Sequence, residues 1–231
     1  MEEAEKLLDL VKSGYNKIAV SFDATRKKEL WPQIRQFTAA VQSGDMILDA
    51  GCGNGRLAEA FSGQSVTYLG LDNSRELLKA ARKNYPHREF READILDLSA
   101  VPEHNFDYIF CLAVLQHIPS RELRLVFLKN LAAKLASNGQ LIISSWNLRR
   151  QPKYRLMIWK NYWLKAMGRR RLAAADLVFP WHDVSGQAVG ERYYHAFRQG
   201  ELRRLSRAAG LSVRSASVDK YNFWLVLVRS S

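Results

Sequence analysis

A glycine-rich turn between a short apolar run and a helical pattern constrains this chain more than any other stretch of it. Residues 46–48 are apolar, as expected of a strand that is buried on both faces of a parallel sheet. Asp49 follows this run, and a helical pattern begins near Arg56. Between them stand Gly51, Gly53 and Gly55. A strand, a glycine-rich turn and a helix predict a site for a nucleotide cofactor, because a residue without a Cβ atom lets a ligand lie against the backbone.

The spacing of the glycines indicates which cofactor this is. A dinucleotide-binding turn has the spacing G-x-G-x-x-G and places a pyrophosphate at the start of the helix. Here the spacing is G-x-G-x-G, and Arg56 stands at the last position that the dinucleotide pattern requires. A carboxylate at Asp49 would repel a phosphate. It suits a cation such as the ammonium group of S-adenosylmethionine, in a charge-assisted hydrogen bond worth about 1.5–3 kcal/mol. The alternative is a glycine-rich turn in another kind of α/β protein.

Two further acids stand where the same cofactor needs them. Residues 66–71 are predicted to form the second strand, and Asp72 follows its end, about 20 residues beyond the glycines, where an acid can accept from both ribose hydroxyls. Asp72 could also cap the helix that starts near Ser74. Residues 88–93 are predicted to form a third strand ending at Asp94, which could accept from the adenine amino group. The expected cofactor-binding residues are Tyr15, Asp49, Gly51, Cys52, Gly53, Asn54, Gly55, Arg56, Asp72, Asn73, Ser74, Asp94, Ile95 and Leu112.

The composition fits one full-sized domain in a reducing compartment. The chain has 231 residues, of which 47% are apolar, enough for a sizeable core. No apolar run approaches the ~18 residues of a membrane span, and residues 1–5 lack the character of a signal peptide. Cys52 and Cys111, the two cysteines, fall in predicted buried stretches and form no C-x-x-C pair. We therefore expect a cytoplasmic protein without structural zinc or another metal site.

The order of the remaining patterns predicts a doubly wound α/β fold. Further strands are expected over residues 106–112 and 140–146, and a closing antiparallel pair over residues 211–218 and 222–229. Helices are expected over residues 2–12, 32–42, 119–136 and 201–209. Strands and helices that alternate at such short intervals indicate a Rossmann-like, seven-stranded and mostly parallel sheet with a C-terminal antiparallel hairpin. We expect residues 1–231 to form a single domain, with residues 148–197 as a basic and aromatic insert lobe within it.

The positive charge of the chain is segregated towards this insert. Residues 1–147 contain 18 Lys or Arg and 18 Asp or Glu, whereas residues 148–231 contain 17 and 5 and so carry the whole net charge of +12. Residues 148–175, expected to form a helix followed by a loop, contain nine basic residues and no acidic one. The aromatic residues interleaved with them are Tyr154, Trp159, Tyr162 and Trp163. Such segregation indicates an anionic partner.

Three roles of the insert are compatible with its residues. Cations for phosphates and ring faces for unpaired bases are the components of an RNA-binding surface. The insert could equally be an amphipathic helix that packs on the sheet, with its rings buried and its basic stems along the surface. Attachment to an anionic membrane surface is the third role. The first two overlap, because the rings can pack inward while the cations face RNA.

Blocks of residues along nearly the whole chain match one known family. The blocks are residues 15–19 (YNKIA) with 25–26 and 31–32, 49–55 (DAGCGNG), 113–118 (AVLQHI), 178–182 (VFPWH), 192–197 (RYYHAF) with 200–202, and 221–224 (YNFW). In these blocks the chain resembles the class I S-adenosylmethionine-dependent tRNA methyltransferases. The more specific resemblance is to the enzymes that methylate 5-carboxymethyluridine at the tRNA wobble position, including the methyltransferase part of the AlkB-type tRNA hydroxylase. The family usually has two histidines where this chain has Gln116 and His117, and residues 148–175 do not match the eukaryotic pattern.

The resemblance implies transfer of a methyl group from S-adenosylmethionine to a carboxylate, with S-adenosylhomocysteine as the second product. A carboxylate is already ionised at pH 7 and needs no general base, so the protein has to hold and orient an anion, a task for arginine or protonated histidine. Arg26 and Arg192 are the candidates, with Tyr193 and His195 shaping the pocket. If the acceptor were instead a hydroxyl or a ring nitrogen, His117 could be the base.

Other assignments stay open from the residues alone. Arg26 could pair with a surface acid, His117 could be structural, and Trp181 and His182 are expected to pack within the lobe. The protein could also methylate a small acidic metabolite or lipid, or bind the cofactor and recognise RNA without catalysis. The partners implied by the resemblance are tRNA and, as in related eukaryotic enzymes, a small zinc-binding activator protein.

Overall fold

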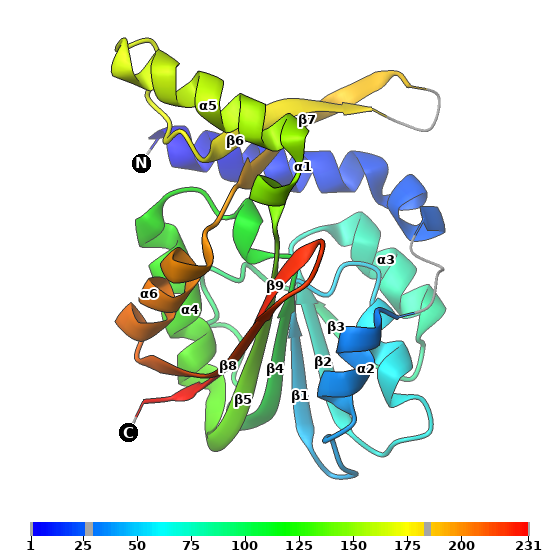
Figure 1. The fold of residues 1–231 in the computed structure, drawn as a ribbon. Coiled ribbons are helices and arrows are strands. Elements are labelled where there is room, and N and C mark those ends of the chain that lie inside the picture. Colours follow the sequence, from blue (N-terminus) through cyan, green and yellow to red (C-terminus); the bar gives the residue numbers. More distant parts are fainter. Residues whose placement is uncertain (1, 26–29, 183–185, 231) are drawn as a thin grey trace.

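The computed structural model describes residues 2–25, 30–182 and 186–230, and its centre is a seven-stranded sheet (Figure 1). The strands are β1 Met46–Ala50, β2 Thr67–Asp72, β3 Glu89–Glu92, β4 Phe106–Leu112, β5 Leu135–Trp146, β8 Leu211–Val218 and β9 Asn222–Arg229. Their order across the sheet is β3-β2-β1-β4-β5-β9-β8. The strands from β3 to β5 are parallel, and β9 is antiparallel to both of its neighbours. The predicted fold class is therefore confirmed.

Helices cover both faces of the sheet, because successive strand residues point to opposite sides. In β4, Ile109 and Cys111 belong to a core with helices α4 and α6, whereas Phe110 between them belongs to a core with α2 and α3. The helices are α1 Glu2–Thr25, α2 Pro32–Thr38, α3 Arg75–Asn84, α4 Arg121–Lys134, α5 Pro152–Ala166 and α6 Gln199–Ala208, with 3-10 turns η1 Arg56–Phe61, η2 Leu115–His117 and η3 Leu148–Arg150.

The insert folds as a helix against a two-stranded antiparallel hairpin. Helix α5 and the loop that follows it up to residue 175 agree with the prediction, whereas the strands β6 Asp176–His182 and β7 Ala188–His195 are not predicted from the sequence. The apolar side chains of the hairpin pack against Tyr154, Met157 and Ile158 of α5. Pro180 stands inside β6, which is tolerated because each strand of a two-stranded sheet has an unpaired edge. A short strand that contains a proline shows little of the alternation by which strands are recognised.

The first helix is twice as long as the amphipathic pattern indicated. It continues to Thr25 and lies across the end of the sheet that carries the lobe (Figure 1). Contacts with α3 and β7 hold it there, together with a hydrogen bond from the Ser74 hydroxyl, at the start of α3, to Asn16 Oδ1 at 2.7 Å. The second half of α1 lacks the apolar periodicity of a helix packed on a core, because its residues Tyr15 and Phe22 line the cavity described below.

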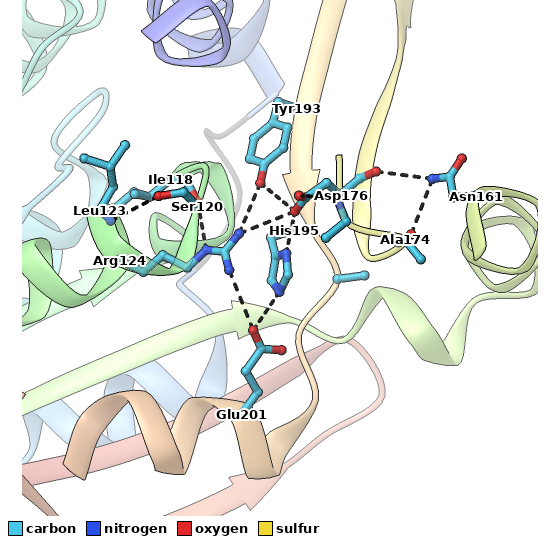
Figure 2. Close-up of polar contacts among 12 residues, drawn as sticks. Ile118, Ser120, Leu123, Arg124, Asn161, Ala174, Asp176, Tyr193, His195 and Glu201 are labelled. Carbon is cyan, nitrogen blue, oxygen red and sulfur yellow. Dashed lines mark hydrogen bonds and ion pairs between the residues drawn. The ribbon is translucent and has the colours of Figure 1, made fainter. Parts of the chain in front are cut away.

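A buried cluster of charged side chains joins the lobe to the sheet (Figure 2). At its centre, Asp176 Oδ1 accepts a hydrogen bond from Tyr193 Oη at 2.7 Å and lies 2.6 Å from His195 Nδ1. The same oxygen lies 3.4 Å from Arg124 Nη2. His195 Nε2 lies 2.9 Å from Glu201 Oε1. Both ring nitrogens of His195 therefore face carboxylates, and both can donate only when the ring is protonated.

This cluster connects four separate elements, namely α4, β6, β7 and α6. Arg124 Nε also donates to the carbonyl of Ile118 at 2.9 Å, which fixes the end of η2 to the same cluster. Burial raises the pKa of Asp176 and Glu201, but hydrogen bonds from His195 and the charge of Arg124 outweigh it, so both pKa values lie below their usual range. The lobe is therefore held in place by carboxylates that are ionised at neutral pH.

Asp176→Asn should lower the free energy of unfolding at neutral pH by about 3–5 kcal/mol, because it leaves the remaining buried charges uncompensated. The variant should also lose less of its free energy of unfolding than the wild type when the pH is lowered. A carboxyl group with a lowered folded-state pKa stabilises the protein above its unfolded-state pKa of about 4, and this contribution is lost as the pH falls through the folded-state value. Urea unfolding from neutral to acidic pH measures both effects. Asp9→Asn, at an exposed position of α1, is the control, and equal acid sensitivity of Asp176→Asn and the wild type would contradict this account.

Candidate active site

The residues predicted to hold a cofactor meet in one cavity at the carboxyl ends of the parallel strands. The strand order reverses between β1 and β4, and the cavity lies beyond these ends, the usual place for a ligand in an open α/β sheet. Of the predicted cofactor residues, Gly55 and Ser74 alone do not line it. The rest of its lining is mostly apolar, with Leu8, Val11, Phe22, Leu30, Trp31, Ile34, Leu57, Leu77, Leu96, Ala113, Val114, His117, Ile118 and Trp146.

The glycine turn at the base of the cavity requires glycine for two reasons. The φ angles are +81° at Gly51, +56° at Gly53 and +77° at Gly55, a region that other residues rarely adopt. A Cβ atom on Gly51 would also lie 2.4 Å from Val114 Cγ2, and one on Gly55 would lie 2.8 Å from Phe90 Cζ. Gly55 thus lets the turn pack against β3, which explains why it does not face the cavity.

Asp49 places a buried carboxylate at the end of β1. Its side chain is 3% exposed and accepts a hydrogen bond from the Tyr68 hydroxyl at 2.7 Å. Burial raises the pKa of Asp49 to about 7; the Tyr68 hydrogen bond lowers it, and the charge of Asp72 raises it further. A carboxyl group in this state gains most from a ligand that brings a positive charge.

Asp72 fixes the glycine turn to the second strand. Its Oδ2 accepts from the Gly53 amide at 2.8 Å, and its Oδ1 accepts from the Ser74 amide at 2.9 Å. Burial raises the pKa of Asp72, while these two backbone hydrogen bonds lower it. Ser74 rather than Asp72 caps α3, because its hydroxyl oxygen accepts from the Leu77 amide. The carboxylate of Asp72 retains acceptor sites for ligand hydroxyls, since each oxygen has two.

Three other predicted cofactor residues lie at the cavity and make contacts with the protein. Asp94 is exposed at the edge of the cavity, where Oδ1 accepts from the Leu96 amide at 2.9 Å. The guanidinium of Arg56 stacks on Trp31, with 5.3 Å between its central carbon and the ring centroid. Asn54 donates to Asp23 Oδ1 of α1 at 2.9 Å, which ties the turn to the helix above it.

His117 lies at the opposite side of the cavity and is neutral at pH 7. Its Nε2 is 3.0 Å from the Tyr15 hydroxyl, and its ring packs edge-on against Tyr194 with centroids 4.9 Å apart. Burial lowers the pKa of His117 to about 4; a hydrogen bond with the backbone of Tyr193 raises it, and the charge of Arg192 lowers it. A neutral imidazole cannot hold an anion by charge.

Arg192 lies beside the edge of the cavity, although it does not line it. The central carbon of its guanidinium is 3.6 Å from the centroid of the Trp181 ring, and Nη1 donates to the Tyr194 hydroxyl at 3.4 Å. Its Nε is buried and has no hydrogen-bond partner within the part of the chain that the structure describes. The Trp181 ring in turn contacts Tyr15, a lining residue, with centroids 5.5 Å apart. A stacked guanidinium leaves its edge donors available to a planar anion.

The structure does not bring all predicted acceptor residues to this place. Tyr193 and His195 point into the cluster around Asp176 and do not line the cavity, which corrects the expectation that they shape the pocket. The reason is the alternation of β7, which directs Arg192 and Tyr194 to one side and these two residues to the other. Arg26 lies outside the described residues.

Sequence reasoning also overlooked residues that belong to the site. Tyr68, the partner of Asp49, was assigned only to a strand. The sequence places Tyr194 only within a matching block and predicts that Trp181 packs within the lobe, although Trp181 supports Arg192. In each case the signal that would have helped is the pairing of neighbouring strands, which a single sequence does not contain.

Residues 22–216 match the family model described as a methyltransferase domain. The chain belongs to this family. It is 27% identical to a tRNA (carboxymethyluridine(34)-5-O)-methyltransferase of Schizosaccharomyces pombe, over 97% of this chain and 98% of that protein. It is 26% identical to the tRNA (carboxymethyluridine(34)-5-O)-methyltransferase alkbh8 of Xenopus tropicalis, over 95% of this chain but 40% of that protein.

Solved structures share the fold at low sequence identity. A SAM-dependent methyltransferase of Methanosarcina mazei has a TM-score of 0.70 at 18% identity, over 88% of this chain and 99% of that one. The complex between the Trm112 methyltransferase activator and a putative methyltransferase of Haloferax volcanii contains a chain with a TM-score of 0.63 at 16% identity, over 94% of this chain and 98% of that one. The family and the fold together identify an S-adenosylmethionine-dependent methyltransferase.

Three further findings concern metal ligands, helices and thiols in the described residues. Within residues 2–25, 30–182 and 186–230, no three His, Cys, Asp or Glu side chains are grouped so that they could hold a metal ion. None of the helices in these ranges has the length and apolar character of a bilayer span. Cys52 and Cys111 are buried free thiols, and burial raises the pKa of both, which makes them poor nucleophiles.

Affinity for S-adenosylmethionine should depend on the ionisation of Asp49. Because its pKa is about 7 in the free protein and a bound cation favours the carboxylate, affinity should fall by up to about tenfold per pH unit below that value. Asp49→Asn should bind about 10- to 100-fold more weakly near pH 7.5 and lose this pH dependence. Calorimetry from pH 5.5 to about 7.5 measures both effects. Asp9→Asn is the matched control. An Asp49→Asn variant whose affinity for S-adenosylmethionine still changed with pH in this way would contradict the role of the Asp49 carboxylate.

Proposed function

We propose that this enzyme transfers a methyl group to the carboxylate of a carboxymethyl group on a uridine of tRNA. The observation that carries the proposal is Arg192, stacked on Trp181 beside the edge of the cofactor cavity, with a buried donor that has no partner in the described chain. Relatives that match this chain over nearly its whole length are named for this reaction. A carboxylate acceptor needs an oriented cation more than it needs a base.

The cofactor side of the proposal rests on the acids around the glycine turn. We assign Asp49 to the ammonium group of S-adenosylmethionine, Asp72 to the ribose hydroxyls and Asp94 to the adenine amino group. Gly51 and Gly53 allow the ligand to approach the backbone. When bound, the cofactor supplies the methyl group and becomes S-adenosylhomocysteine.

The acceptor side is a matter of positioning. Arg192 holds the carboxylate, and its stacking on Trp181 limits the orientations of the guanidinium fork. His117 is neutral, so it adds no charge, and with Tyr15 it forms a polar wall of the cavity. The low pKa of His117 makes it a weak base, which also favours an acceptor that is ionised before it binds.

Two partners belong to the same proposal. The cations of the lobe suit tRNA, and an enzyme of tRNA modification would act in the cytoplasm. Because a Haloferax volcanii chain of the same fold was solved with the Trm112 activator, we also propose that a small, zinc-binding activator protein of this kind supports the present enzyme.

Replacing Arg192 should impair turnover but not cofactor binding. Arg192→Gln should lower kcat/KM for modified tRNA by about 10- to 100-fold, the value of a hydrogen bond to a charged group. Arg192→Lys should recover only part of this loss, because an ammonium group lacks the planar fork. Steady-state methylation assays and calorimetry with S-adenosylmethionine separate the two effects. Arg198→Gln, at an exposed position, is the control. Unchanged turnover, or lost cofactor affinity, in Arg192→Gln would contradict the proposed role.

The acceptor itself can be identified from tRNA nucleosides. Mass spectrometry of tRNA from cells with and without the gene should show loss of a methylated uridine and accumulation of its carboxymethyl precursor. The methyl group should be released by mild alkali, because the product is an ester. A methylated product that resists alkali would exclude a carboxylate, and unchanged tRNA with a labelled small acid would favour the alternative of a metabolite or lipid methyltransferase.

A further inference from the structure

The outer face of α5 exposes an unusual apolar stripe. Leu156, Trp159 and Trp163 of α5 and Met167, its C-cap residue, follow one another at spacings of three or four residues and are 67%, 62%, 49% and 56% exposed. Tyr162, next to them, is 61% exposed. Of the eight large apolar side chains that the described residues expose, five are in this group. We call these five residues the α5 stripe.

The α5 stripe is not needed to hold the helix in the fold. The opposite face of α5 packs Tyr154, Met157 and Ile158 against the hairpin. Asn161 on that face is buried and donates to the carbonyl of Asp176 at 3.2 Å. The helix is therefore anchored from within, and the apolar outer face calls for a different explanation.

The charges around the α5 stripe indicate that its partner is an anion. Residues 148–175 carry nine cations and no acid, and among the described residues no ion pair involves a cation of α5. The cations on α5 or just beyond it are Lys153, Arg155, Lys160, Lys165 and Arg169. A polyanion that also presents flat apolar surfaces fits both features, and RNA with unpaired bases is such a molecule.

The rings of the α5 stripe are arranged in a way that suits stacking. Trp163 meets Trp159 at 6.1 Å with 74° between the ring planes, and meets Tyr162 at 6.0 Å with 82°. An edge-to-face contact occupies one face of only one of the two rings, so other ring faces stay available to a flat ligand. A continuous aliphatic surface would have favoured a lipid bilayer or a second copy of the chain instead.

The α5 stripe is also connected to the active site through packed rings. Tyr154, on the inner face of α5, contacts Phe179 at 5.5 Å, and Phe179 contacts Tyr194 at 5.3 Å. Tyr194 packs on His117, which lines the cavity. Because this lobe is fixed to the sheet by the Asp176 cluster, a nucleic acid held on α5 would have a defined position relative to the cofactor.

We propose that the α5 stripe is a stacking platform for unpaired bases of the RNA substrate, with the neighbouring cations on its phosphates. This inference rests on the proposed function, since it takes the substrate to be RNA, and it adds which face of the molecule holds it. The lobe would thereby recognise an unpaired loop rather than a paired stem.

The experiment measures binding of an unmodified RNA stem-loop, and of a paired RNA duplex of equal length, to the full chain without cofactor. Trp159→Ala/Trp163→Ala should weaken stem-loop binding about 10- to 100-fold while duplex binding changes little. The salt dependence of stem-loop binding should be the same in this variant as in the wild type, because stacking releases no counterions. Lys160→Ala/Lys165→Ala should instead reduce the slope of affinity against salt by about 2. Tyr221→Ala, at an aromatic residue 58% exposed outside the lobe, should change neither.

Conservative variants separate stacking from damage to the fold. Trp159→Phe/Trp163→Phe keeps ring faces and should retain most of the stem-loop affinity, and every variant should bind S-adenosylmethionine like the wild type. The proposal would be overturned by unchanged stem-loop affinity in the double alanine variant, or by equal losses in the alanine and phenylalanine variants. It would also be overturned if that alanine variant lost binding to phosphatidylglycerol vesicles, or self-association, but kept its affinity for RNA.

Failure of this proposal can be told from failure of the proposed function. The RNA in the binding experiment carries no carboxymethyl group, so the result does not depend on the acceptor. Trp-dependent stem-loop binding without methylation of carboxymethyluridine would remove the acceptor and keep the platform. Methylation that is indifferent to the alanine variant, together with unchanged binding, would keep the acceptor and remove the platform.

Discussion

The carboxylate of Asp176 has to be paired, and the arrangement of the molecule depends on that requirement. Asp176 belongs to the lobe, whereas Arg124 and Glu201 come from helices that cover the sheet. Taking such charges out of water costs several kcal/mol per ion unless each finds partners of good geometry. Apolar contacts between lobe and sheet would tolerate sliding. A cluster in which one oxygen meets Tyr193, His195 and Arg124 does not, so we regard it as a device for orientation more than for net stability.

The orientation set by this cluster extends to residues at one side of the cavity. The strand that sends Tyr193 and His195 into the cluster directs Arg192 and Tyr194 to its other side. Arg124 also holds the carbonyl of Ile118, the residue that follows His117. The side of the cavity that we propose for the acceptor therefore derives its geometry from buried charges that do not line the cavity.

The two halves of the site differ in how far the sequence predicts them. Asp49, Asp72 and the glycine turn follow directly from local patterns, because the ends of parallel strands meet at one edge of the sheet whatever the rest of the chain does. The acceptor half depends on a hairpin whose alternation is obscured by Pro180 and by aromatic residues that pack on both sides. Without that strand, the direction of Tyr193 could not be known. The support of Arg192 by Trp181 is a cross-strand contact, and only the pairing of β6 with β7 reveals it.

The proposed reaction removes charge from an apolar cavity, and the surrounding residues favour such a change. A sulfonium cation and a carboxylate anion become a neutral thioether and a neutral ester. Water stabilises the separated charges more than it stabilises the partly neutralised transition state, so walls such as Phe22, Val114 and Trp146 lower the barrier if the charges can enter paired. In the proposed complex Arg192 pairs with the acceptor carboxylate, while Asp49 pairs with the amino-acid ammonium group of the cofactor and so fixes where the sulfonium lies. After transfer, the ester has lost the charge that Arg192 binds, whereas the amino-acid ammonium on the spent cofactor still faces Asp49. The ester group should therefore be held less tightly in the cavity than the carboxylate it replaces, whereas S-adenosylhomocysteine keeps its contact with Asp49.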